Sequence, residues 1–161
     1  MANVTTFLKA TSGNSQRGRN VFMVENTINL VGSAINPSTP DTASVLTLPK
    51  GCKVMAAGVE VVESATMNTG TDATVSLGFT GGDVDEFVAT FDIDGAADGA
   101  YAPEIAIDGT TVATADDTID LLFAGTGASF TAGKLRVYAV MMDVSGQGDT
   151  SANEVDRDAL A

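Results

Sequence analysis

Acidic side chains are the residues of this chain whose types and spacing could support chemistry. They form three short clusters, namely Asp83, Asp85 and Glu86; Asp92, Asp94 and Asp98; and Asp116, Asp117 and Asp120. Two carboxylates suffice for glycoside hydrolysis. Sugar-processing sites usually add aromatic platforms, however, and the chain has no Trp and two Tyr. The clusters therefore do not favour a glycosidase, and we assign no catalytic residue.

Calcium binding is the stronger chemical hypothesis for one cluster. The segment Asp92-Ile93-Asp94-Gly95 resembles the opening of an EF-hand loop. The match then fails, because Ala97 stands where Gly is required and Pro103 stands where a bidentate Glu is required. A calcium loop of another kind remains an alternative to solvated acids in turns. We predict no metal site and no cofactor.

The remaining nucleophiles and bases do not form an enzymatic pattern. The chain has no His, so the commonest general base and the Ser-His-Asp and Cys-His schemes are absent. The single Cys52 excludes an internal disulfide and is expected to be a small buried apolar side chain. The Gly-rich turn at Gly81-Gly82 lacks the Lys-Ser/Thr ending and the long helix of a phosphate-binding loop. The sequence therefore predicts a protein that is not an enzyme.

Charge is distributed unevenly along the chain. The net charge is −13, and residues 60–133 hold 14 acidic residues with no Lys or Arg. The first 20 residues instead contain Lys9, Arg17 and Arg19 and no acid. An acidic body disfavours nucleic acid and anionic membranes as partners. Either the acids simply keep the body soluble, or the basic arm meets an acidic partner, and for the second case Lys9, Arg17 and Arg19 are the candidate partner-binding residues.

The length of 161 residues fits one domain with tails. Residues 1–18 are polar and are predicted to be a flexible N-terminal arm. Residues 145–161 are rich in Gly, Asp and Ser and are predicted to be a flexible acidic tail. The domain between them covers residues 19–144. We expect no signal peptide, no membrane-spanning helix, and a reducing compartment for the lone thiol.

Short stretches rich in β-branched and apolar residues predict strands. They lie at residues 20–31, 45–48, 53–63, 73–79, 101–107, 118–124 and 134–144. Residues 53–63 are apolar almost throughout, which is typical of a central strand covered on both faces, with Gly58 as a candidate bulge. Asp83 is expected to cap one helical turn over residues 84–88. The pattern predicts an all-β fold, a sandwich or barrel, with a single jelly-roll-like β-sandwich preferred.

Several segments resemble a known class of proteins in their order along the chain. They are Leu48-Pro49-Lys50-Gly51 before an apolar strand, the segment from Leu77 to Phe87, Asp92-Ile93-Asp94, the segment from Asp117 to Leu122, and the segment from Thr131 to Val137. This order is similar to that of small virion proteins of tailed bacteriophages, often from marine hosts, over roughly residues 20–144. The resemblance rests on turn and strand patterns.

The resemblance implies a capsid decoration (cement) protein that binds and stabilises the outside of the phage head. It implies a homo-oligomer, most often a homotrimer, with the major capsid protein as partner and the virion surface as location after assembly in the host cytoplasm. It transfers no catalytic residue. Two alternatives remain: another phage virion component such as a neck, tail or head-fibre part, and a non-viral carbohydrate-binding β-sandwich module.

Overall fold

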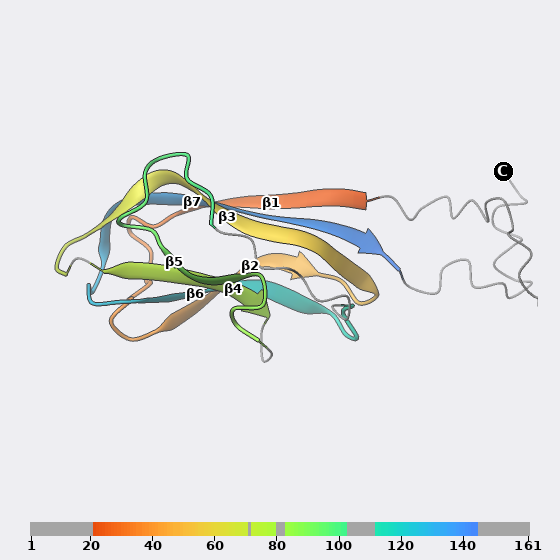
Figure 1. The fold of residues 1–161 in the computed structure, drawn as a ribbon. Helices are drawn as coiled ribbons and strands as arrows, with labels where there is room; N and C mark the ends of the chain where they lie inside the picture. The colour runs from red at the N-terminus through yellow and green to blue at the C-terminus, as the bar shows by residue number, and fades with distance from the viewer. Residues whose placement is uncertain (1–20, 71, 80–82, 103–111, 145–161) are drawn as a thin grey trace, which may run out of the picture.

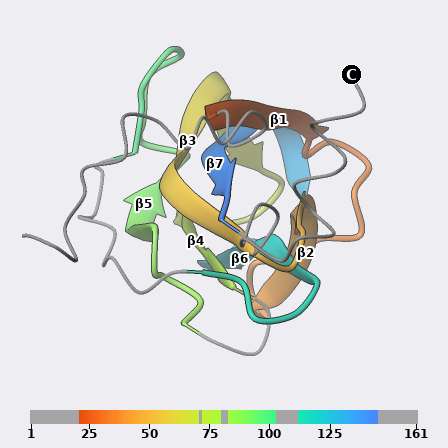
Figure 2. The ribbon, with the colours of Figure 1, turned by 90° about the vertical axis from the view of Figure 1, so that its right-hand side faces the viewer.

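Seven antiparallel strands form two sheets in this computed structural model, which describes residues 21–70, 72–79, 83–102 and 112–144. The strands are β1 (Val21–Asn29), β2 (Asp41–Leu48), β3 (Cys52–Met67), β4 (Ala73–Phe79), β5 (Val88–Asp92), β6 (Asp117–Gly125) and β7 (Phe130–Asp143). One sheet has the order β1-β7-β3 and the other the order β2-β6-β4-β5. The two sheets lie face to face (Figures 1 and 2), which confirms the predicted all-β sandwich.

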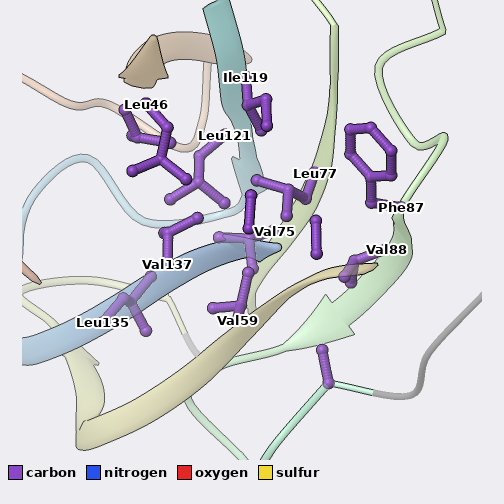
Figure 3. Close-up of a cluster of buried hydrophobic side chains, with 14 of the residues drawn as sticks. Leu46, Val59, Val75, Leu77, Phe87, Val88, Ile119, Leu121, Leu135 and Val137 are labelled. Carbon is purple, nitrogen blue, oxygen red and sulfur yellow. The ribbon is translucent and has the colours of Figure 1, made fainter. Parts of the chain in front are cut away.

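The core lies between the sheets and follows from the alternation of the strands. In β4, Ala73, Val75 and Leu77 are buried, whereas Thr74 and Ser76 are only half-buried. Strand β7 contributes five buried apolar side chains, namely Phe130, Leu135, Val137, Ala139 and Met141. Figure 3 shows side chains from both sheets filling the space between the layers. Each fully buried Val or Leu contributes about 1.5–3 kcal/mol to folding, so this interface between the sheets is the main source of stability.

The free side of β3 is covered by chain that follows β5. The Ala102 N–H donates to the Val59 carbonyl (2.9 Å), and the Val61 N–H donates to the Ala100 carbonyl (2.8 Å). Farther along β3, Val112 forms an isolated bridge with Lys53. A jelly roll has eight strands, whereas the described residues form seven. The segment beside β3 would have to serve as the eighth strand. The jelly-roll assignment stays a prediction.

Strand β3 differs from the expected central strand in two respects. The prediction of a central position is wrong, because β3 ends the order β1-β7-β3. The predicted bulge at Gly58 is also wrong, because the nearest register shift lies between Val54 and Ala56 and Gly58 pairs directly with Tyr138. A Cβ on Gly58 would lie 2.6 Å from the Tyr138 hydroxyl. The glycine therefore makes room for this ring.

The helical turn expected over residues 84–88 is wrong. The Asp85 N–H donates to Asp83 Oδ1 (3.3 Å), and the Phe87 N–H donates to the Leu77 carbonyl (2.9 Å). These bonds lead the chain through a turn into β5, which begins at Val88. Strand β5 was not predicted from the sequence, because only Val88 and Phe91 of its five residues are shielded from solvent. No helix occurs among the described residues.

The arm (residues 1–18), the tail (residues 145–161) and all but the first two residues of the strand expected at 101–107 lie outside the described residues. The bounds of the arm, the domain and the tail therefore stay predictions. Tyr101, the first residue of that expected strand, pairs with Glu60 as an isolated bridge. In the part of the chain that the structure covers, no helix is long and apolar enough to cross a membrane.

Candidate partner-binding surface

The solvent side of the four-stranded sheet carries mainly hydroxyl groups. Residues directly opposite each other in antiparallel strands share a face, so the register places the following on this side: Thr42, Ser44, Thr74, Ser76 and Thr118. The Thr118 hydroxyl lies 3.3 Å from the Ser44 hydroxyl. None of the four strands contains Lys or Arg. This side is mostly polar, with Leu122 and Ala124 among the hydroxyl groups, and its strands offer no cation to an acidic partner.

The solvent side of the β1-β7-β3 sheet, here called the outer face, differs in charge. Three cations and three acids lie along it, namely Lys53, Lys134 and Arg136 with Glu25, Glu60 and Glu63. Arg136 Nη2 lies 2.8 Å from Glu60 Oε2, and Glu63 pairs with Lys134 in the strand register. The chain has a net charge of −13, whereas the charged side chains of the outer face are equal in number and opposite in sign.

Two tyrosines also lie on the outer face. The Tyr138 ring covers Gly58, and its centroid is 6.4 Å from that of exposed Tyr101. The two rings meet at 66°. They therefore do not form one flat surface of the kind that stacks on a sugar ring.

The carboxylates of the cluster that resembled a calcium loop accept hydrogen bonds from backbone amides. Asp92 Oδ1 accepts from the Gly95 N–H (2.7 Å), Asp94 Oδ1 from the Ala73 N–H (2.6 Å), and Asp98 Oδ1 from the Ser64 N–H (2.7 Å). Each carboxylate thus holds a turn or a strand end. Over the described ranges, no three His, Cys, Asp or Glu side chains are grouped so that they could hold a metal.

Asp94 gives this cluster a pH dependence. Burial raises the pKa of Asp94, the nearby Asp92 charge raises it further, and the hydrogen bond from Ala73 opposes the shift. A carboxyl whose pKa is raised by folding destabilises the folded state above that pKa and is relieved as the pH falls through it. Asp94→Asn should therefore unfold at equal or higher urea concentration than wild type at pH 7, with the difference shrinking toward pH 4.

A second variant separates charge from hydrogen bonding at this position. Asp94→Ala removes the acceptor for the Ala73 N–H, which lies in a fully buried residue. Leaving such a donor unpaired costs about 1–3 kcal/mol, so this variant should be destabilised at both pH values. Equal stabilities of the Asn and Ala variants would contradict the proposed role of this hydrogen bond, whereas an Asn variant less stable than wild type at pH 7 would contradict the proposed role of the carboxylate charge.

The other two acidic clusters are likewise built into turns and strands. Asp83 and Asp85 are exposed neighbours whose hydrogen bond lowers the pKa of Asp83 and raises that of Asp85. Asp116 Oδ1 accepts from the Lys50 N–H (2.9 Å). Asp120 is buried on the solvent side of β6, where it pairs in the register with Gly78.

Cys52 is buried at the start of β3. Burial raises the pKa of its thiol, and the charge of Asp143 adds to the shift. The thiolate is the reactive form of cysteine, so this environment suits a packing role. The expectation of a small buried apolar side chain is confirmed.

The sequence-predicted partner-binding residues Lys9, Arg17 and Arg19 lie outside the described residues. The structure therefore does not place them, and their role stays a prediction. It does describe the start of β1, where Val21 pairs with Met142 near the end of β7. The start of β1 and the end of β7 therefore lie at the same end of the sandwich (Figure 1).

Sequence reasoning missed the apolar residues of the outer face at this same end. They lie in β1, β3 and β7, and β7 contains the run Val137-Tyr138-Ala139-Val140-Met141-Met142. Such a run without alternation is typical of a strand covered on both faces. Applying the rule used for residues 53–63 to β7 would have indicated a covered outer face.

Two solved chains have a similar fold. One belongs to a structure described as the cyanophage Pam1 capsid asymmetric unit, with a TM-score of 0.61 and 22% sequence identity, covering 88% of this chain and 96% of that one. The other belongs to the acidic stable capsid structure of Helicobacter pylori bacteriophage KHP30, with a TM-score of 0.52 and 16% identity, covering 76% of this chain and 86% of that one. At these identities the likeness shows a shared fold. No protein-family model and no curated protein matches the sequence.

Proposed function

We propose that this chain is a virion structural protein, without enzymatic activity, that decorates the outside of a bacteriophage capsid as a homo-oligomer, most simply a trimer. In this proposal its partners are the major capsid protein and further copies of itself, and it joins the particle in the host cytoplasm. The observation that carries the proposal is the fold shared with chains of two phage capsid structures, one match covering nearly the whole of both chains.

Sequence and surface properties support the same proposal. The motifs that resemble tailed-phage virion proteins fall in the sandwich and its turns, from Leu48 in β2 to Val137 in β7. The acidic clusters hold backbone groups in place, as a scaffold requires. The chain has no His, so the commonest general base is missing.

The deciding experiment is add-back to particles. Purified protein is mixed with capsids that lack it, the particles are pelleted, and bound copies are counted against the major capsid protein. Decoration predicts many regularly spaced copies per particle. A few copies, or binding confined to a tail vertex, would identify another virion component, and no binding would favour a non-viral module.

The same assay tests the basic arm. Exposed ion pairs are worth about 0–1 kcal/mol each. Replacing Lys9, Arg17 and Arg19 together by Ala should therefore weaken particle binding by about tenfold, while the urea midpoint of the sandwich stays unchanged. The matched control exchanges the cations (K9R, R17K and R19K), which keeps the charge and should bind like wild type. Equal binding of the Ala variant and this control would remove the arm from the proposal.

A further inference from the structure

One end of the outer face carries apolar side chains where strand alternation calls for polar ones. This apolar patch consists of Val21 and Met23 from β1, Met55 and Ala56 from β3, and Val140 and Met142 from β7. Register ties the strands together there, since Val21 pairs with Met142 and Val140 pairs with both Met23 and Ala56. The four-stranded sheet places hydroxyl groups on the corresponding side. The apolar patch therefore differs in polarity from the solvent side of the other sheet of this sandwich.

The patch is exposed to solvent in the described structure. Met23 is 59% exposed, Val21 57% and Met55 46%. Contiguous apolar surface that is open to water marks interaction sites. Three of the six residues are Met, a residue type enriched at protein interfaces and able to adapt its shape to a partner.

We propose that the apolar patch is the contact between copies of this chain. The inference rests on the homo-oligomer of the proposed function and names the surface that forms it. Val21 begins β1 and pairs with Met142 near the end of β7, and these two strand ends lie at one end of the sandwich (Figure 1). Three copies can therefore bring their patches together around a three-fold axis. Each copy would remove Met23, Val21 and Met55 from water at that axis.

The charges around the patch favour a second copy over a strongly charged partner. Glu25 follows Met23 along the outer side of β1, and Lys53 lies opposite Met142 on β3. The outer face as a whole carries equal numbers of cations and acids, so Glu25 of one copy can approach Lys53 of the next. A site for a strongly charged shell would instead carry an excess of the opposite sign.

Net charge explains why association would use this face. Copies of net charge −13 repel one another, and the strands of the four-stranded sheet contribute no cation to offset it. Contact through the balanced outer face keeps those acids apart. Salt shortens the screening length from about 8 Å at physiological strength to about 3 Å at 1 M. An apolar contact between acidic bodies should therefore strengthen with salt.

The test compares the oligomeric state of two full-length variants by sedimentation equilibrium. In Met23→Lys/Met55→Lys, two exposed apolar side chains of the patch become cationic. The matched control is Val31→Lys, since Val31 is 49% exposed but follows β1 at the far end of the strand. Each added Lys makes the net charge less negative, which by itself favours association. Weaker association of the double variant can then come only from placing charge in the apolar contact.

We expect wild type and Val31→Lys to form the same oligomer, more tightly in 1 M NaCl than in 0.15 M. The double variant should have a dissociation constant at least about tenfold higher than that of wild type. Its urea midpoint, measured on the monomer, should equal that of wild type. A monomeric wild type, or a double variant that associates like wild type, overturns the inference. So does a double variant that oligomerises normally but loses particle binding, because the shell would then cover the patch.

The add-back assay separates this inference from the proposed function. Wild-type protein that coats capsids but stays monomeric in free solution and on the particle overturns the self-contact while decoration stands. Protein that oligomerises through the patch but does not bind capsids leaves the self-contact in place and overturns decoration.

Discussion

Replacing Phe123 by Ala should lower the free energy of unfolding by about 3–5 kcal/mol. Phe123 is fully buried on β6, and its ring meets that of Phe130 at a centroid distance of 6.1 Å. Strand β6 lies between β2 and β4, so hydrogen bonds on both sides keep the backbone from closing the cavity. Domains of this kind are stable by about 5–15 kcal/mol, so the loss is a large part of the total.

Urea unfolding followed by circular dichroism measures this effect. Leu122→Ala is the matched control, because Leu122 is the preceding residue and points to the half-buried solvent side of the same strand. It should cost about 1 kcal/mol. Similar midpoints for the two variants would mean that the core does not lie on the side of β6 that carries Phe123.

The second large effect is expected at Gly78. A Cβ there would overlap the Asp83 carbonyl oxygen and the Val84 backbone, because the turn before β5 lies against the solvent side of β4. The Phe79 N–H donates to that same carbonyl (2.9 Å). Gly78→Ala must displace the turn and weaken this bond, and should cost about 3–4 kcal/mol.

Gly99→Ala is the control for the general effect of replacing a glycine. Gly99 has a positive φ of 82°, and nothing lies within 4 Å of a Cβ built on it. Its substitution should cost about 1–2 kcal/mol from backbone strain alone. If Gly78→Ala were no worse than Gly99→Ala, the turn would not be packed against β4.

The strands that were predictable are those with strong local patterns. Residues 73–79 alternate between apolar and small polar side chains, and β4 has these same bounds. Strand β6 differs from its prediction by one residue at each end. Alternation works because successive side chains point to opposite sides of a strand.

Elements that depend on distant partners were not predictable from local pattern. Strand β5 forms because β4 offers pairing partners, with Leu77 opposite Val88 and Val75 opposite Phe91. The apolar residues 53–63 suggested a central strand, whereas β3 is covered along its side by residues such as Ala100 and Ala102. A continuous apolar pattern indicates that a strand is covered, but it does not identify the segment that covers it.

The candidate site was less predictable than the fold. Lys9, Arg17 and Arg19 were chosen from charge along the sequence, whereas the balanced charges and the apolar patch of the outer face emerge only when β1, β3 and β7 are aligned in register. Met23 and Met55 are distant in sequence and meet only through β7. A surface formed by three strands has only a weak sequence pattern in any one of them.

The position of β7 between β1 and β3 bears on how the chain folds during synthesis. β7 is the last described strand, and it supplies the pairing partners for both β1 and most of β3. The three-stranded sheet therefore cannot close until the ribosome has made residues up to Asp143 and released them from its exit tunnel. A nascent chain that stops earlier leaves two long strands unpaired and prone to aggregation. Such sequence-distant pairing predicts slow folding, with hydrogen-exchange protection of β1 and β7 acquired together.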